Sequence, residues 1–230
     1  MNECQVFDGA MLDAAGLNLQ AIFNLADLPA AIVGRLDGDS QYRQLILLGH
    51  GGRALWQAVQ AAGGASENPI DDFSRQQVEQ WFATCWPEQR YRVLYPGPAA
   101  IGLQALGKLA GWHHDSPFML GINATWGSWY AYRAVVLADT RFAPSVAAPG
   151  ISPCADCAPR SCVTACPAGA LDGQAFSLEK CIAWRRLPAS SCRHSCLARL
   201  ACPVASEHRY SAEQMRHSYA ISLRMIETLY

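Results

Sequence analysis

From Cys154 to Pro203 the chain reads CADCAPRSCVTACP (154–167), continues to an isolated Cys181, and ends in CRHSCLARLACP (192–203). This stretch holds eight of the ten cysteines in the 230-residue chain. They form two short runs, and each run closes with a Cys-Pro pair. Proline fixes φ and has no backbone N–H, so the cysteine before it is held extended. The pattern predicts two loops that each present several thiols.

Thiolates are ligands of iron–sulfur clusters and of the soft metals zinc and copper(I). The run C-x2-C-x2-C-x3-C-P is the bacterial ferredoxin signature, in which the fourth cysteine binds the other cluster. Here the first run has four residues between its second and third cysteines, and the second run is also wider than the standard spacing. By ferredoxin logic we predict two [4Fe-4S] clusters, one held by Cys154, Cys157, Cys162 and Cys202 and the other by Cys166, Cys181, Cys192 and Cys196.

Three other uses of the cysteines compete with clusters. Disulfides belong to oxidising compartments, but residues 1–10 have neither a basic start nor an apolar run, so we expect no signal peptide and a cytoplasmic location. Structural zinc also uses C-x2-C pairs. The widened spacings would also suit a motif that no longer binds its cluster. Cys4 and Cys85 stay outside the ligand set, because neither has a partner cysteine within a loop's reach in sequence.

The composition is that of a compact protein with a sizeable core, 51% apolar and 16% charged, with a formal net charge of −1. No apolar run reaches the length of a membrane span. No block of Lys or Arg stands out. We therefore expect neither a membrane nor a nucleic-acid partner.

Before the cysteines, strand-like and helix-like segments alternate, which predicts an α/β layer without requiring a parallel sheet. Gly49-His50-Gly51-Gly52 suits a turn between a strand and a helix, and a plain tight turn is favoured over one that presents backbone N–H groups to a phosphate. Ser74 and Ser211 suit helix N-caps. The fold class is α+β, with an α/β domain at 1–143, the cysteine domain at 150–210 and a C-terminal helix at 211–230. The expected strands are 17–25, 44–48, 91–95, 118–122 and 129–138, and the expected helices begin near 29, 54, 74, 99 and 211.

A resemblance rests on Gly111-Trp112, on Trp126-Gly127-Ser128-Trp129-Tyr130-Ala131-Tyr132-Arg133-Ala134-Val135-Val136-Leu137, and on the first cysteine run. With these the chain resembles the epoxyqueuosine reductases. Over the Gly-Ser-Trp strand alone it is similar to the cobalamin-trafficking chaperone. The run from Cys196 to Val204 also resembles a group of short bacterial proteins usually called ferredoxins. These resemblances imply a nitroreductase-like, cobalamin-chaperone-like α/β domain that binds cobalamin, followed by a ferredoxin-like two-cluster domain that supplies electrons.

The chain departs from the reductases at three places. The position of their acidic proton donor falls on Tyr95, a candidate catalytic residue whose phenol, with an ordinary pKa near 10, is a slow acid at neutral pH. Where the reductases continue Ile-Gly-Lys-Asn, this chain has His113-His114-Asp115-Ser116. The helical-repeat tail with which they hold tRNA has no counterpart in these 230 residues. We therefore expect no queuosine chemistry on tRNA.

Five residues are candidates for holding a cobalamin or FMN. A mid-strand arginine must meet a carboxylate, a phosphate or a cofactor, so Arg133 serves either an internal salt bridge or a cofactor contact. The histidines could bind cobalt or a flavin, although surface loop positions are more common. Aromatic rings at 126 and 129 could stack on a macrocycle, although core packing is favoured. The candidates are Arg133, His113, His114, Trp126 and Ser128.

Two classes of function follow from these residues. In the first, two [4Fe-4S] clusters pass electrons from a redox partner protein to a cobalamin or FMN, and a small molecule is reduced there. In the second, the α/β domain has lost its cofactor and the chain is an electron carrier or docking module without catalysis of its own. Loss of the acidic residue favours the second class, and retention of the Gly-Ser-Trp to Arg133 strand favours the first.

Overall fold

The computed structural model describes residues 5–36, 41–63, 66–147, 150–172 and 175–230, so Cys4 lies outside the described residues. The chain divides into two compact units. The first comprises Met1–Trp112 and Tyr130–Pro149, and the second comprises His113–Trp129 and Gly150–Tyr230. All eight cysteines of the predicted ligand sets lie in the second unit.

The first unit is built on one four-stranded sheet with the order β1-β2-β6-β3. Its strands are β1 (Leu19–Asn24), β2 (Gln44–Gly51), β6 (Tyr130–Ala138) and β3 (Tyr91–Tyr95), and every pair is antiparallel. The four strands lie where the sequence predicts them. The mixed α/β class is confirmed.

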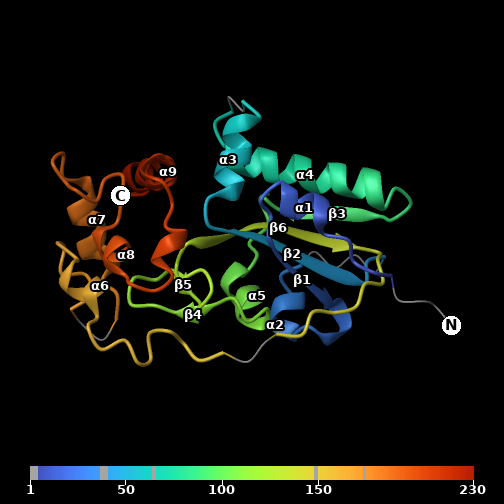
Figure 1. Ribbon diagram of the computed structural model, residues 1–230, viewed down its shortest axis with the longest axis horizontal. Helices are drawn as coiled ribbons and strands as arrows, with labels where there is room; N and C mark the ends of the chain where they lie inside the picture. The colour runs from blue at the N-terminus through green and yellow to red at the C-terminus, as the bar shows by residue number, and fades with distance from the viewer. Residues whose placement is uncertain (1–4, 37–40, 64–65, 148–149, 173–174) are drawn as a thin grey trace. The chain divides into compact units, whose positions relative to one another are not determined.

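Helices cover both faces of this sheet (Figure 1). One face carries α1 (Ala10–Ala14), α3 (Ala54–Ala61) and α4 (Pro69–Cys85), and the other carries α2 (Ala30–Val33) and α5 (Leu103–Leu109). A 3-10 turn, Leu25–Asp27, follows β1. The two helix layers explain why β2 is buried along its whole length, because the side chains on both faces of the strand pack against apolar helices.

The start of α4 differs from the prediction. The helix begins at Pro69, so Ser74 lies inside it and donates from Oγ to the carbonyl of Ile70 at 2.7 Å. Proline suits the first position of a helix, where its missing N–H costs nothing, and Asp71 and Asp72 suit the positive end of the helix dipole. These signals are stronger than a serine in the middle of an otherwise helical run.

The predicted glycine turn at 49–52 is wrong for its first three residues. β2 continues to Gly51 and pairs with β6 along this length, and only Gly52 has a left-handed φ, +73°. A Cβ on Gly49 would lie 2.9 Å from the carbonyl oxygen of Ala131. These glycines therefore allow β2 to extend rather than turn.

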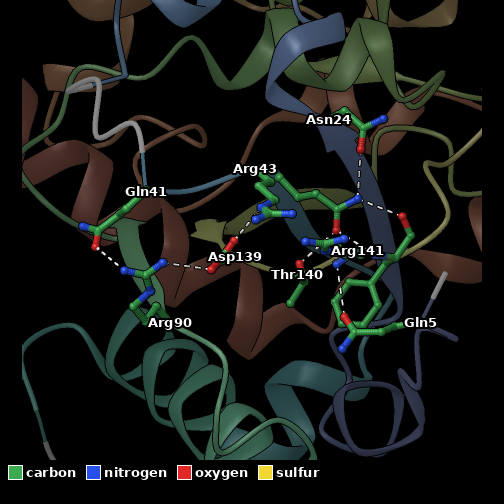
Figure 2. A network of polar contacts seen from close by, with 10 residues as sticks. Gln5, Asn24, Gln41, Arg43, Arg90, Asp139, Thr140 and Arg141 are labelled. Atoms are coloured by element: carbon green, nitrogen blue, oxygen red, sulfur yellow. Dashed lines mark hydrogen bonds and ion pairs between the residues drawn. The ribbon is translucent and has the colours of Figure 1, made fainter. Parts of the chain in front are cut away.

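A polar network at one end of the sheet includes Asn24, Asp139 and Thr140 (Figure 2), and the buried side chain of Gln44 belongs to it. Its Nε2 donates to Asn24 Oδ1 at 3.0 Å and to the carbonyl of Phe142 at 2.8 Å, while its Oε1 accepts from Thr140 Oγ1 and from the N–H of Phe142, each at 2.9 Å. At the same end Asp139 pairs with Arg43 at 2.8 Å and with Arg90 at 2.9 Å. The network ties the ends of β1 and β2 to the segment after β6.

Three short helices lie within the cysteine segment of the second unit, namely α6 (Ser161–Thr164), α7 (Leu178–Arg186) and α8 (Leu197–Ala201). The 3-10 turn Ser206–His208 and the long helix α9 (Ala212–Leu229) follow the last cysteine. Ser211 caps α9 by accepting from the N–H of Gln214, as predicted. The expected strand at 118–122 is reduced to β5 (Gly121–Ile122), which pairs with β4 (His114–Asp115).

Among the described residues, no helix combines the length and the apolar character needed to cross a membrane.

Candidate functional site

The first predicted set of thiols gathers in one place in the second unit. Burial raises the pKa of Cys154, and the thiols of Cys202, Cys162 and Cys157 raise it further against a hydrogen bond from Ser152. Burial also raises the pKa of Cys162, with further contributions from Cys202 and Cys157. Thiols that influence one another's charge in this way are close neighbours.

The second predicted set gathers separately. Burial raises the pKa of Cys181, and the thiols of Cys196, Cys166 and Cys192 raise it further, while the Arg185 guanidinium lowers it. These neighbours fall into the two sets that ferredoxin spacing predicts. The assignment of a cluster to each set stays a prediction.

An apolar cavity of about 570 Å³ adjoins the second set. All four of its cysteines line the cavity, together with apolar side chains that include Phe118, Leu171 and Ile182. The cavity therefore places four thiols around a space whose exposed wall surface is mainly apolar.

Two buried arginines also line this cavity. Arg185 is 7% exposed and Arg199 is 6% exposed. Arg185 donates from Nε to the carbonyl of Cys192 at 3.1 Å, and Arg199 lies over the ring of Trp129 at 4.4 Å and over that of Tyr210 at 4.8 Å. The Arg185 guanidinium thus donates to carbonyls and a hydroxyl, and the Arg199 guanidinium donates to Ser128 while it lies over two rings.

Among the described residues, no carboxylate pairs with Arg185 or Arg199. Burial of an ion costs several kcal/mol unless an opposite charge compensates it. A set of four thiolates around a [4Fe-4S] core is an anion, so the buried cations, the thiols and the apolar cavity fit such a group. The nine described cysteines are all free thiols. Within the described ranges, no three His, Cys, Asp or Glu side chains form a group that could hold a single metal ion.

Cys196 receives two hydrogen bonds. Burial raises the pKa of its thiol, while the backbone N–H of Arg199 and the hydroxyl of Tyr219 lower it by donating to the sulfur. Tyr219 in turn accepts a hydrogen bond from the Arg199 guanidinium, and burial raises the pKa of its phenol. Arg199, Tyr219 and Cys196 therefore form one chain of donors that ends on a thiol.

The Gly-Ser-Trp motif lies against the cysteine segment. Ser128 accepts two hydrogen bonds from Arg199, one to its carbonyl at 2.5 Å and one to Oγ at 3.4 Å. The ring of Trp126 lies 4.4 Å from that of His208, and Trp129 is fully buried, in the core as favoured. Packing of the second unit accounts for these contacts, and a cofactor role for Trp126 and Ser128 stays a prediction.

A polar cluster forms at Arg133 in the first unit. Leu48 pairs with Ala134 and Gly49 pairs with Tyr132, so Arg133 is the extra residue of a β-bulge. Its Nη1 lies 3.7 Å from Oδ1 of Asp71, and its Nε donates to Nδ1 of the fully buried His50 at 2.9 Å. Bulges redirect side chains and are common next to active sites. The internal ion pair, one of the two predicted alternatives for Arg133, is present.

Tyr95 belongs to the same electrostatic neighbourhood. Burial raises the pKa of its phenol, Asp71 raises it further, and Arg133 lowers it. Burial likewise raises the pKa of Asp71, against the lowering effect of Arg133. Asp71 is not among the residues predicted from the sequence, because the expected position of the acid is the end of the strand at Tyr95. The acidic first turn after Pro69 was the available signal.

The two histidines differ in exposure. The His113 side chain is 2% exposed, and its Nε2 lies 3.3 Å from Oδ1 of Asp115. His114 is partly buried in β4. The second unit therefore holds His113 inside rather than on a surface loop. A cofactor contact by His113 or His114 stays a prediction.

Neither the family models nor the curated proteins contain a match to this chain. Solved structures do match. Epoxyqueuosine reductase from Bacillus subtilis has a TM-score of 0.54 and 14% identity, over 90% of this chain and 67% of that one. A catabolic reductive dehalogenase in complex with 3-bromo-4-hydroxybenzoic acid has a TM-score of 0.50 and 14% identity, over 93% of this chain and 33% of that one.

The B12-trafficking protein CblC of C. elegans has a TM-score of 0.49 and 14% identity, over 96% of this chain and 95% of that one. Another epoxyqueuosine reductase structure contains an epoxyqueuosine-modified tRNA stem loop. The chain thus spans about two thirds of the length of the epoxyqueuosine reductases. At these identities the likeness concerns the fold, and the predicted resemblance to the epoxyqueuosine reductases is confirmed at that level.

Proposed function

We propose that this chain is an iron–sulfur oxidoreductase, which uses two [4Fe-4S] clusters and a cobalamin- or flavin-type cofactor to reduce a small molecule. Cys154, Cys157, Cys162 and Cys202 would hold one cluster, in a ferredoxin-like segment. Cys166, Cys181, Cys192 and Cys196 would hold the other. When bound, the clusters would supply single electrons that a redox partner protein delivers.

The observation that carries the proposal is the environment of the second set of thiols. Four thiols and two buried arginines surround one apolar cavity, and neither arginine has a carboxylate partner among the described residues. An anionic cluster would supply the compensating charge. Unused thiols would leave both arginines without that charge. Zinc bound by four thiolates is also an anion, so iron and sulfide analysis separates it from a cluster.

The polar cluster of the first unit supplies candidates for proton transfer. A carboxyl group with a raised pKa holds a proton closer to neutral pH, whereas a phenol with a raised pKa releases one less readily. We therefore favour Asp71 over Tyr95 as the acid in this unit. Arg133 would then set the charge of Asp71 rather than contact the substrate.

A second candidate function, electron transfer without catalysis, has one observation in its favour. Arg133 already has internal partners in Asp71 and His50, so the strand arginine does not require a cofactor for its charge. On this alternative the first unit would be a docking platform for the cysteine segment.

We propose a small molecule rather than tRNA as the substrate, because charge is nearly balanced over the chain and no basic block stands out. The tRNA in one similar structure makes this worth testing directly. Gel-shift titration with unmodified and epoxyqueuosine-modified tRNA stem loops should show no retention at physiological salt. Retention that weakens steeply with salt would contradict the expectation.

The experiment that tests the proposed function begins with protein purified without oxygen. We expect about eight iron and about eight sulfide per chain, the content of two four-iron clusters. Titration with hydroxocobalamin and with FMN should then shift the absorption spectrum of one of them. Full iron without a spectral shift would select the electron carrier, and zinc or no metal would overturn both functions.

A further inference from the structure

We infer that the two proposed clusters differ in reduction potential, and that the set Cys166, Cys181, Cys192 and Cys196 holds the cluster of higher potential. The difference presupposes two bound clusters and therefore rests on the proposed function. Reduction adds one negative charge to a cluster, so nearby cations and hydrogen-bond donors to the sulfurs raise its potential.

The second set has cations and a hydroxyl donor within its walls. Arg185 and Arg199 are buried and line the cavity of these four cysteines. The guanidinium of Arg185 is anchored by the carbonyl of Cys192 and also by Ser222 Oγ at 2.9 Å and the Tyr219 carbonyl at 3.0 Å. The hydroxyl of Tyr219 donates to Cys196 and accepts from Arg199. The positive charge is thus held in place beside the thiols.

The first set has a weaker electrostatic environment. A carboxylate, Asp156, lies between Cys154 and Cys157 in sequence and is exposed. Arg209 donates to the carbonyl of Cys202 at 3.3 Å but is only partly buried. The hydroxyl of Ser152 donates to Cys154. Arg160 lies between Cys157 and Cys162 in sequence and is also exposed. One partly buried cation, one exposed cation and one exposed carboxylate thus stand here, against two buried cations at the second set.

Burial does not separate the two sets. Cys162 and Cys202 of the first set are 8% and 5% exposed, and Cys192 of the second is 8% exposed. Charge therefore decides the order, because buried cations act in a medium of low dielectric constant where their field is weakly screened. The cluster of the second set should therefore be reduced first.

The test is a redox titration of the full chain, followed by EPR, on protein whose iron and sulfide contents already establish two clusters. The wild type should show two reduction steps. Tyr219→Phe removes one hydroxyl donor and should lower the potential of the higher step only. We expect about a tenfold change in the ratio of reduced to oxidised cluster, which is about 59 mV for one electron.

Ser152→Ala is the matched control, since it removes one hydroxyl donor from a thiol of the other set, and it should lower only the lower step. If Tyr219→Phe loses iron, Asp156→Asn provides the test instead. Removal of this exposed carboxylate must raise the potential of the lower reduction step. Coincident steps in the wild type would overturn the inference, as would movement of the lower step by Tyr219→Phe. Protein without two clusters counts against the proposed function instead.

Discussion

Arg133 donates a hydrogen bond from Nε to Nδ1 of His50 across 2.9 Å, in a part of the sheet where His50 is fully buried. A nitrogen that accepts from a guanidinium carries no proton, so the contact requires a neutral imidazole. The positive charge of the pair therefore stays on the arginine, where Asp71 can balance it. The strand arginine is part of a local polar cluster in the first unit.

Arg133→Met should lower the free energy of unfolding of the first unit by about 1–3 kcal/mol, since it leaves the buried acceptor of His50 without its donor. Denaturation in urea, followed by tryptophan fluorescence, measures the change. Arg35→Met removes an exposed arginine of the same unit and should change stability by less than about 0.5 kcal/mol. Equal effects of the two substitutions would contradict a structural role for the cluster.

Asp71 should titrate above its ordinary pKa of 3.8, because burial outweighs the attraction of Arg133. The fold favours the protonated carboxyl, so its contribution to stability is complete below pH 3.8 and is lost as pH rises through the raised value. Asp71→Asn should therefore gain stability over the wild type as pH rises. The carboxyl ¹³C chemical shift measures the pKa directly, with Asp71→Asn as the assignment. In Arg133→Met the pKa should rise further, and a fall would contradict the described contact.

Gly127→Ala should destabilise the second unit for two reasons. Gly127 has φ +57°, and a Cβ would lie 2.4 Å from the carbonyl oxygen of Val204, just after the last Cys-Pro. The strained φ alone costs about 1–3 kcal/mol. Gly63→Ala separates the two causes, because Gly63 has φ +67° with no atom within 4 Å of the added carbon. The larger loss in thermal unfolding should come from Gly127→Ala, and equal losses would remove the steric part of the explanation.

The sheet could be predicted from local patterns, whereas the surroundings of the site could not. Every second residue of β1 is apolar, and short apolar runs bounded by turns mark β2 and β6, so period and length suffice to place them. The spacing of the cysteines likewise predicts two sets, because the ligands of one loop are close in sequence. Both kinds of signal are local.

The contacts that surround the candidate site join residues far apart in the chain. Arg199 looks like one more charge on a short helix, and nothing near it in sequence indicates that it lies between two aromatic rings and beside a cavity. Asp71 reads as an ordinary acid in a first helical turn. Sequence patterns give the faces of single elements, but the partner of a buried charge depends on which elements pack together.

The partition of the cysteines gives the last prediction. Cys154→Ala and Cys202→Ala remove ligands that belong to one proposed cluster, so each should lose about half of the iron, and the double variant should lose no more than either single variant. Cys154→Ala combined with Cys181→Ala should lose nearly all of it, since each change damages a different cluster. Iron and acid-labile sulfide analysis without oxygen measures both outcomes.

Cys85→Ala is the control for the loss of a thiol as such. Cys85 belongs to the first unit, where its Sγ lies 3.9 Å from Sδ of Met11, so its replacement should leave the iron content unchanged. Additive losses from Cys154→Ala and Cys202→Ala would mean that these thiols serve different metal centres. The cross-over of the fourth cysteine, on which the two sets depend, would then be wrong even if both clusters were present.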